Sequence, residues 1–264
     1  MKHDLKNLPS NQTIVVEESD NADGSFLIYH FLSLFLRSPA NAKVYLVSCR
    51  QTVNHFNTVL SKLGVQFKRS IDQNRCRIFD LMNHFRVNDF NFDVNKSIEL
   101  IESDFSTFCD QVNSPILFII DDVSILFDFG LPIDEIYRFF HALRFCAKQR
   151  KACFSLTLST YDDNLLENHE KFAKIVRYYA DYLLKVEKLK TGLSKEVSGT
   201  LSIINFEQKN IEPLVTNKQF KAVKGPYMND FDDSAILHYD RRGNSMKSTV
   251  AWLNQHNSRN DAVG

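Results

Sequence analysis

The sequence has no excess of charge of either sign, since 32 Lys and Arg balance 32 Asp and Glu. Such a chain has no global basic field to attract nucleic acid, so any contact with RNA must be local or shared with partners. The five cysteines are widely spaced and form no CxxC pair. We therefore predict free, buried thiols in a reducing compartment, the cytosol or the nucleus.

Several other patterns are missing. The eight histidines form no HxH, HxxxH or HExxH spacing, so a metal site has no support. Neither the G-x-S-x-G of hydrolases nor the G-x-G-x-x-G of dinucleotide-binding folds occurs. The N-terminus lacks a signal peptide, and the longest nearly apolar stretch, residues 26–36, is too short to span a bilayer. We expect a soluble protein without metal, cofactor or membrane contact.

What is present is a strand, a turn and a helix laid out like a phosphate-binding loop. A β-branched run at 13–17 precedes a polar turn and an apolar helix predicted at 24–37. If Gly24 is the second glycine of G-x-x-x-x-G-K-[ST], Ser19 stands at the first. Ser25 then replaces the lysine, and Phe26 replaces the hydroxyl that ligates magnesium. The residues that would hold a phosphate are therefore missing.

The charge of this turn also argues against a nucleotide. The turn carries four acids and has no Lys or Arg between Lys6 and Arg37. Carboxylates near a triphosphate repel it. In an effective dielectric of 20, each close pair of like charges costs roughly a few kcal/mol. The favoured structural interpretation is that the last two acids cap the following helix. The four acids are Glu17, Glu18, Asp20 and Asp23.

Asp121 and Asp122 follow a fully apolar run at 116–120 and have the strongest catalytic claim in the chain. Acids at the carboxyl end of a parallel strand lie where α/β proteins bind ligands, and they resemble the acid-tipped strand of ATPases. Without the lysine and the hydroxyl, a magnesium ion would have no phosphate to bridge. We favour a structural or interface role and predict no catalytic residue.

The remaining periodicity predicts an α/β protein. Strands are expected at 43–48, 75–81, 116–121 and 153–159, with helices at 51–63, 92–112, 133–150 and 165–179 between and after them. This alternation implies a mainly parallel sheet covered by helices on both faces. Strands at 182–189, 199–206 and 235–239 have no intervening helix, which indicates an antiparallel extension. No linker divides the chain, so we predict one domain over 1–264, ordered from about 12 to 250 with frayed ends.

Several short stretches stand out in order along the chain: DGSFL at 23–27, HFLS at 30–33, KLGV at 62–65, IIDD at 119–122 with SIL at 124–126, and TG at 191–192 through VSGTL at 197–201. Together they resemble the Elongator complex protein 6 family. The resemblance implies a three-layer RecA-like fold without functional Walker motifs. It also implies a hetero-hexameric ring with the fourth and fifth Elongator subunits, joined to the remaining Elongator core. It implies further that this ring supports tRNA binding and that the wobble-uridine chemistry lies in another subunit.

Two other functions remain open. The chain could be a nucleotidase with a divergent loop that recruits a lysine from elsewhere or from a neighbouring subunit. It could also be an interaction module unrelated to RNA. For tRNA, the loops at 122–132 and 160–168 are acidic and contain no Lys or Arg, so they cannot neutralise phosphates. The better candidate for a tRNA or subunit contact is the hairpin around Gly192, which carries Lys185, Lys188, Lys190 and Lys195.

Overall fold

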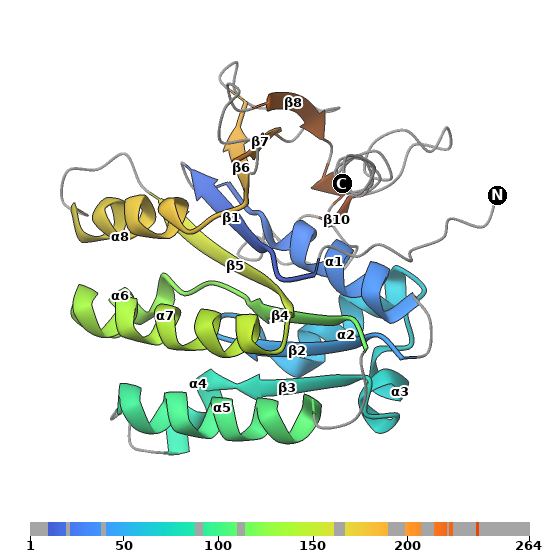
Figure 1. Cartoon of the computed structure of the whole chain (residues 1–264). Coiled ribbons are helices and arrows are strands. Elements are labelled where there is room, and N and C mark those ends of the chain that lie inside the picture. The colour runs from blue at the N-terminus through green and yellow to red at the C-terminus, as the bar shows by residue number, and fades with distance from the viewer. Residues whose placement is uncertain are drawn as a thin grey trace, which may run out of the picture.

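The computed structural model describes most of the chain, and Figure 1 shows the arrangement of its elements. The described residues are 10–19, 22–37, 41–87, 92–109, 114–160, 167–189 and 199–206, with the backbone of 214–220, 222–223 and 236–237. The strands of the main sheet are β1 (Thr13–Ser19), β2 (Lys43–Ser48), β3 (Cys76–Asp80), β4 (Ile116–Ile120), β5 (Cys153–Thr160), β6 (Tyr182–Lys188), β7 (Gly199–Asn205) and β8 (Leu214–Phe220). The helices are α1 (Ser25–Arg37), α2 (Val53–Lys62), α3 (Phe67–Asp72), α4 (Leu81–Val87), α5 (Val94–Cys109), α6 (Ile125–Asp128), α7 (Ile133–Gln149) and α8 (Glu167–Tyr178).

The main sheet has eight strands in the order β3-β2-β4-β5-β1-β6-β7-β8. The strands from β3 to β6 are parallel, and β7 and β8 extend the sheet in antiparallel pairings. Strand β5 separates β1, which leads into the phosphate-loop-like turn, from β4, which carries the paired acids. The predicted RecA-like α/β fold with an antiparallel C-terminal extension is confirmed.

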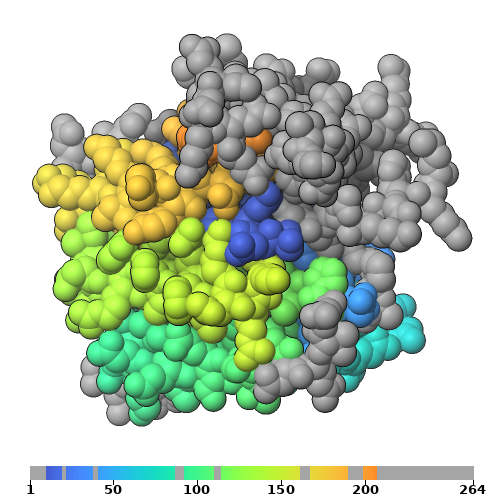
Figure 2. Space-filling view, in the orientation of Figure 1, coloured from blue at the N-terminus to red at the C-terminus, as the bar shows by residue number. Residues whose placement is uncertain are grey.

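Helices cover both faces of the sheet, as the alternation predicted. Helices α1, α2 and α3 enclose one apolar core, and α4 to α8 enclose the other. Figure 2 shows the surfaces of α5, α7 and α8 side by side on one face of the molecule. Neighbouring residues of β1 contribute to opposite cores, because Val15 belongs to the second core and Val16 to the first.

Local sequence signals explain where the long helices run and end. In α5 the buried positions include Val94, Ile98, Ile101, Phe105 and Phe108, which is the apolar stripe that the spacing predicted. At the end of α2, Gly64 has a φ of 74°, in the left-handed region that suits glycine. The N–H of the following residue, Val65, donates to the carbonyl of Leu60 at 2.9 Å, so this glycine ends the helix.

The short elements differ from the sequence prediction. Helices α3, α4 and α6 were not predicted, and α6 occupies part of the expected loop at 122–132. The strand expected at 235–239 is a two-residue strand, β10 (Ile236–Leu237), which pairs with β9 (Ala222–Val223) in a separate sheet. Helices of four to seven residues give too few periodic positions for a pattern to be read, which is why these three helices were missed.

Candidate functional site at the phosphate-loop position

The candidate site lies at the carboxyl ends of β1, β2 and β4, where the first residues of α1 begin. The fold brings together three segments that are far apart in sequence: the end of β1 with the turn before α1, the second residue after β2, and the two acids after β4. Carboxyl ends of parallel strands are the usual ligand-binding edge of such sheets. The degenerate phosphate loop and the paired acids are therefore neighbours.

The backbone donors at the start of α1 are bonded to the chain's own carboxylates. The N–H of Gly24 donates to Glu18 Oε1 at 2.8 Å, and the N–H of Ser25 donates to Asp23 Oδ1 at 2.9 Å. In a working phosphate loop such N–H groups point to the anion. Asp23 thus has the predicted capping role, whereas Asp20 lies outside the described residues.

Gly24 also lies in close contact with β1. A Cβ atom at this position would lie 3.1 Å from the side chains of Glu18 and Val16. The absence of a side chain therefore lets β1 and α1 approach closely enough for Glu18 to bond the Gly24 N–H. Phe26, at the position of the magnesium-ligating hydroxyl, is buried in the core with 2% of its surface exposed. It has no group that could bind a metal ion.

Arg50, the second residue after β2, is the cation of this site. Its Nη1 lies 3.1 Å from Glu18 Oε2 and 3.2 Å from Asp122 Oδ2. Its Nη2 lies 3.3 Å from Asp23 Oδ1 and also donates to the hydroxyl of Ser25. One guanidinium thus contacts three carboxylates and the residue at the lysine position of the loop. We call Arg50, Glu18, Asp23, Ser25 and Asp122 the arginine cluster.

The arginine cluster corrects the charge argument made from the sequence. The turn does lack a local cation, but Arg50 supplies one from a distant segment. Glu17 also does not face the turn: it lies on the other side of β1, where its carboxylate contacts Arg177 at 2.6 Å and Lys185 at 3.3 Å. The prediction that four uncompensated acids of the turn would face a triphosphate is therefore wrong. The position is filled and partly neutralised by the protein itself.

Asp121 has a structural role that the structure shows directly. Its carboxylate, 2% exposed, accepts the N–H groups of Cys49, Arg50 and Gln51, the last two at 3.0 and 3.2 Å. These bonds fix the backbone that presents the Arg50 side chain. Asp122 has a φ of 116°, a conformation that a residue with a Cβ rarely adopts, and its Oδ1 accepts the N–H of Ser124 at 3.0 Å.

Burial and crowding of carboxylates shift the pKa values in the arginine cluster. Burial raises the pKa of Glu18 to about 7, with Arg50 opposing the shift and Asp122 and Asp23 adding to it. Burial likewise raises the pKa of Asp122 to about 6 against the effect of Arg50. Burial alone would lower the pKa of Arg50, but the surrounding carboxylates raise it overall, so the guanidinium stays charged.

The other predicted contact residues lie apart from this edge or outside the described residues. Lys185 is half-buried in its ion pair with Glu17, and Lys188 is exposed at the end of β6. Lys190 and Lys195 fall outside the described residues. Ser19 lies within 3.4 Å of the hydroxyl of Thr160, as part of the edge of the sheet.

Arg50 was not among the residues predicted from the sequence. The available signal was topological: if β2 is parallel to β1 and β4, residues that follow it point to the same edge. Within the described part of the chain, no group of three or more His, Cys, Asp or Glu is arranged to hold a metal ion. The described helices also include none long and apolar enough to cross a membrane.

Fold and site together define a class: RecA-like α/β proteins whose phosphate-loop position is occupied by side chains of the same chain. The family model of Elongation complex protein 6 matches residues 2–84 and 90–223. The chain belongs to this family.

Individual relatives agree with the family match at modest identity. Elongator complex protein 6 of Xenopus laevis is 26% identical over 203 residues, which cover 70% of this chain and 76% of the relative. The Xenopus tropicalis protein is 28% identical over 203 residues, covering 69% and 74%. The human protein is 24% identical over 208 residues, covering 69% and 75%. The predicted family resemblance is thereby confirmed.

Proposed function

We propose that this chain is a non-catalytic RecA-like subunit of the Elongator complex. The observation that carries the proposal is the arginine cluster: Arg50 sits among Glu18, Asp23 and Asp122 beside Ser25, where a phosphate would meet the loop. The backbone donors of Gly24 and Ser25 already have carboxylate partners. A nucleotide would have to displace these contacts and bring its own negative charge among buried acids.

The purified chain is expected neither to bind nor to hydrolyse Mg-ATP. Isothermal titration of the chain with Mg-ATP measures binding, and phosphate release measures hydrolysis. Ser25→Lys alone is expected to leave both unchanged, because Phe26 still provides no magnesium ligand and Arg50 remains in place. Saturable micromolar binding that is lost on changing Asp121 or Asp122 to Asn would instead support the divergent nucleotidase.

The finer proposal is a hetero-hexameric ring with the fourth and fifth Elongator subunits that supports tRNA binding for wobble-uridine modification elsewhere in the complex. It rests on family membership and on the RecA-like sheet. Lys188, with Lys190 and Lys195, is the proposed tRNA or subunit contact of this chain. The arginine cluster is not a proposed contact for the phosphates of tRNA, because Glu18 and Asp122 outnumber Arg50 there.

Reconstitution tests the ring and the RNA contact together. Mixing the chain with both partner subunits is expected to give one species with the mass of two copies of each. Changing Lys188, Lys190 and Lys195 to Glu in that assembly is expected to weaken tRNA binding and to make its salt dependence shallower. If the chain remains a monomer when it is mixed with both partner subunits, the proposed ring is contradicted. Unchanged tRNA affinity in an intact ring removes this hairpin from the RNA path.

A further inference from the structure

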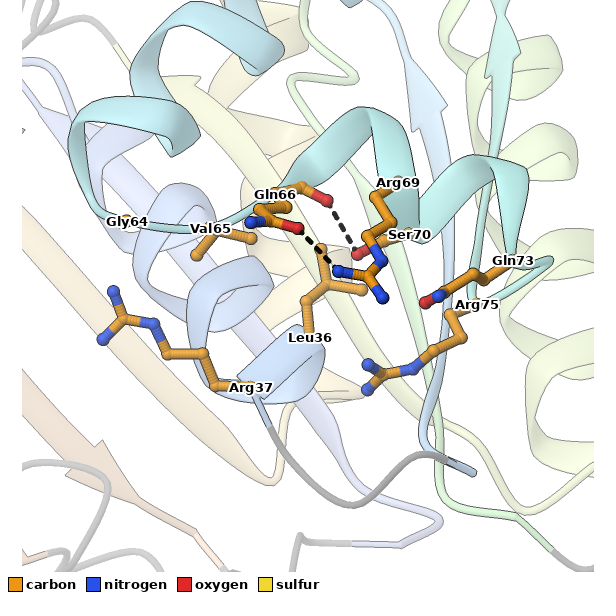
Figure 3. A pocket seen from close by; sticks show the side chains of 9 residues that line it. All are labelled: Leu36, Arg37, Gly64, Val65, Gln66, Arg69, Ser70, Gln73 and Arg75. Atoms are coloured by element: carbon orange, nitrogen blue, oxygen red, sulfur yellow. Dashed lines mark hydrogen bonds between the residues drawn. The ribbon is translucent and has the colours of Figure 1, made fainter.

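A pocket of about 230 Å³ lies between the end of α1 and helix α3 (Figure 3). Two of the arginines that line it are bonded within the chain: Arg37 donates to the carbonyl of Leu63, and Arg69 donates to the side chain of Gln66 at 3.2 Å. We therefore assign no ligand to this pocket. The surface that favours a partner is aromatic and lies on α7 and α8.

Five aromatic side chains from α7 and from the end of α8 meet at this surface, and we call them the aromatic patch. The hydroxyl groups of Tyr137 and Tyr179 lie 3.1 Å apart, and the ring of His141 lies 5.7 Å from that of Tyr137. Tyr178 packs edge-on against Tyr179 at 5.4 Å and is 85% exposed, and Phe145, one turn after His141, is 56% exposed. Of the three large hydrophobic side chains that are exposed in the described part of the chain, two therefore lie in this patch.

The outward face of α7 carries aromatic residues in its middle and charged or polar residues toward its ends. Figure 2 shows the surface of α7 between those of α5 and α8. Arg138 on this face donates to the neutral side chain of Asn95 at 3.4 Å. We call the exposed residues that follow one another at helical spacing along this face the α7 stripe: Asp134, Arg138, His141, Phe145 and Gln149.

The α7 stripe is complementary to its own reverse. If a second α7 packs antiparallel with its centre at His141, Arg138 of one helix lies opposite Phe145 of the other. Asp134 then lies opposite Gln149. A guanidinium over an aromatic ring and a carboxylate beside an amide are both favourable contacts. A parallel arrangement would instead place Asp134 and Arg138 beside their own copies, where like charges repel, and it would also align the two helix dipoles unfavourably.

We propose that two copies of this chain associate through α7, packed antiparallel across a two-fold axis beside His141. The symmetry repeats each contact, so the dimer contains two contacts between Arg138 and Phe145 and two between Asp134 and Gln149. The association removes part of the aromatic patch from water, and aromatic residues and arginine are the types enriched at the centres of protein interfaces. The contact requires no other subunit, so it goes beyond the ring proposed above and does not depend on it.

Sedimentation equilibrium of the full chain, without partner subunits, measures this association. A dimer whose population rises with protein concentration is expected. Phe145→Ser is expected to weaken the dimer roughly tenfold or more, because it removes an aromatic side chain near the centre of the contact. Leu100→Ser is the matched control, since Leu100 is also exposed, at 41%, but lies on α5 outside the aromatic patch. It is expected to leave the dimer unchanged.

Disulfide formation tests the antiparallel order and leaves the aromatic centre untouched. A chain with Asp134→Cys is mixed with a chain with Gln149→Cys under oxidising conditions, and the natural chain with its own cysteines is the control. A disulfide between the two variants is expected because these positions face each other. Neither variant alone is expected to form one, because about 22 Å of helix separates positions 134 and 149, whereas a disulfide needs Cα atoms within roughly 7 Å.

Several results would overturn the proposal. One is a chain that stays monomeric at every concentration tested, and another is an equal loss of dimer in Phe145→Ser and Leu100→Ser. Disulfides that form as readily within each single variant as in the mixture contradict the antiparallel order. If the natural chain is monomeric and Phe145→Ser fails to join the fourth and fifth subunits, a partner subunit covers the aromatic patch instead of a second copy.

Discussion

Replacing Arg50 with alanine is expected to lower the free energy of unfolding by about 3–5 kcal/mol at pH 8. The physical reason is that Glu18 and Asp122, with side chains only 3% and 7% exposed, would lose the cation that stabilises their charged forms. Removing one partner of a buried ion pair is costly because the remaining charge has lost both water and its partner. Urea unfolding of the purified protein, followed by circular dichroism, measures the change.

The pH dependence of this effect identifies its cause. Glu18 has a pKa raised to about 7 from 4.5, so the folded state holds its proton more tightly than the unfolded state does. Stability from this group is therefore present below about pH 4.5 and is lost as the pH rises to about 7. Arg50 lowers the pKa of Glu18, so this pKa is higher when Arg50 is absent. The loss of stability then continues to a higher pH. The Arg50→Ala defect is expected to be smaller at pH 5 than at pH 8.

Two further variants separate this explanation from a general effect of losing an arginine. Glu18→Gln in the Arg50→Ala background is expected to recover part of the stability at pH 8, because it removes a buried charge. Arg77→Ala is the control, since Arg77 pairs with the half-exposed Asp104 at 3.0 Å. It is expected to cost about 1 kcal/mol or less. An Arg50→Ala defect no larger than this, or independent of pH, would contradict the role assigned to the arginine cluster.

Replacing Arg177 with alanine is expected to cost about 2–4 kcal/mol, the second largest effect. The carboxylate of Glu17, 1% exposed within β1, receives two N–H bonds from this guanidinium, at 2.6 and 2.9 Å. Such two-pronged pairs are among the stronger ionic contacts in proteins. Lys185 would remain 3.3 Å from Glu17 and offset part of the loss, so the effect is expected to be smaller than that of Arg50→Ala.

The same helix supplies the control for this second prediction. Lys174 lies 3.9 Å from Glu170 on the exposed face of α8, and Lys174→Ala is expected to change stability by less than about 1 kcal/mol. Glu17→Gln combined with Arg177→Ala is expected to be more stable than Arg177→Ala alone, because no buried charge is left unpaired. If the double variant is the less stable of the two, Glu17 is not the source of the cost.

The sequence was sufficient for the fold because the long elements have regular apolar spacing. The stripe of α5 and the apolar run of β4 each indicate their element type and their buried face. Alternation along β1 could also have placed Glu17 and Glu18 on opposite faces, since neighbouring strand residues point in opposite directions. This inference separates the two acids without any structure.

The side chains that occupy the phosphate-loop position could not be predicted as well as the fold. Ser25 and Phe26 showed which phosphate-loop groups are missing, but not which group replaces them. That Arg50 reaches Glu18 and Asp122 depends on strand order and on the three N–H bonds to Asp121 that fix its backbone. Contacts between residues 32 and 72 positions apart in sequence leave no local pattern.

The placement of Arg50 has an evolutionary consequence. A lineage could regain a phosphate-binding lysine at Ser25 only beside a guanidinium that already contacts that residue. Removing Arg50 first would leave Glu18, Asp23 and Asp122 without their shared cation. Either order of substitution passes through a chain with unmatched charge, which is expected to be less stable than the present one. A lysine at position 25 would therefore need a change at Arg50 and at its acidic partners in the same step to keep the charges matched.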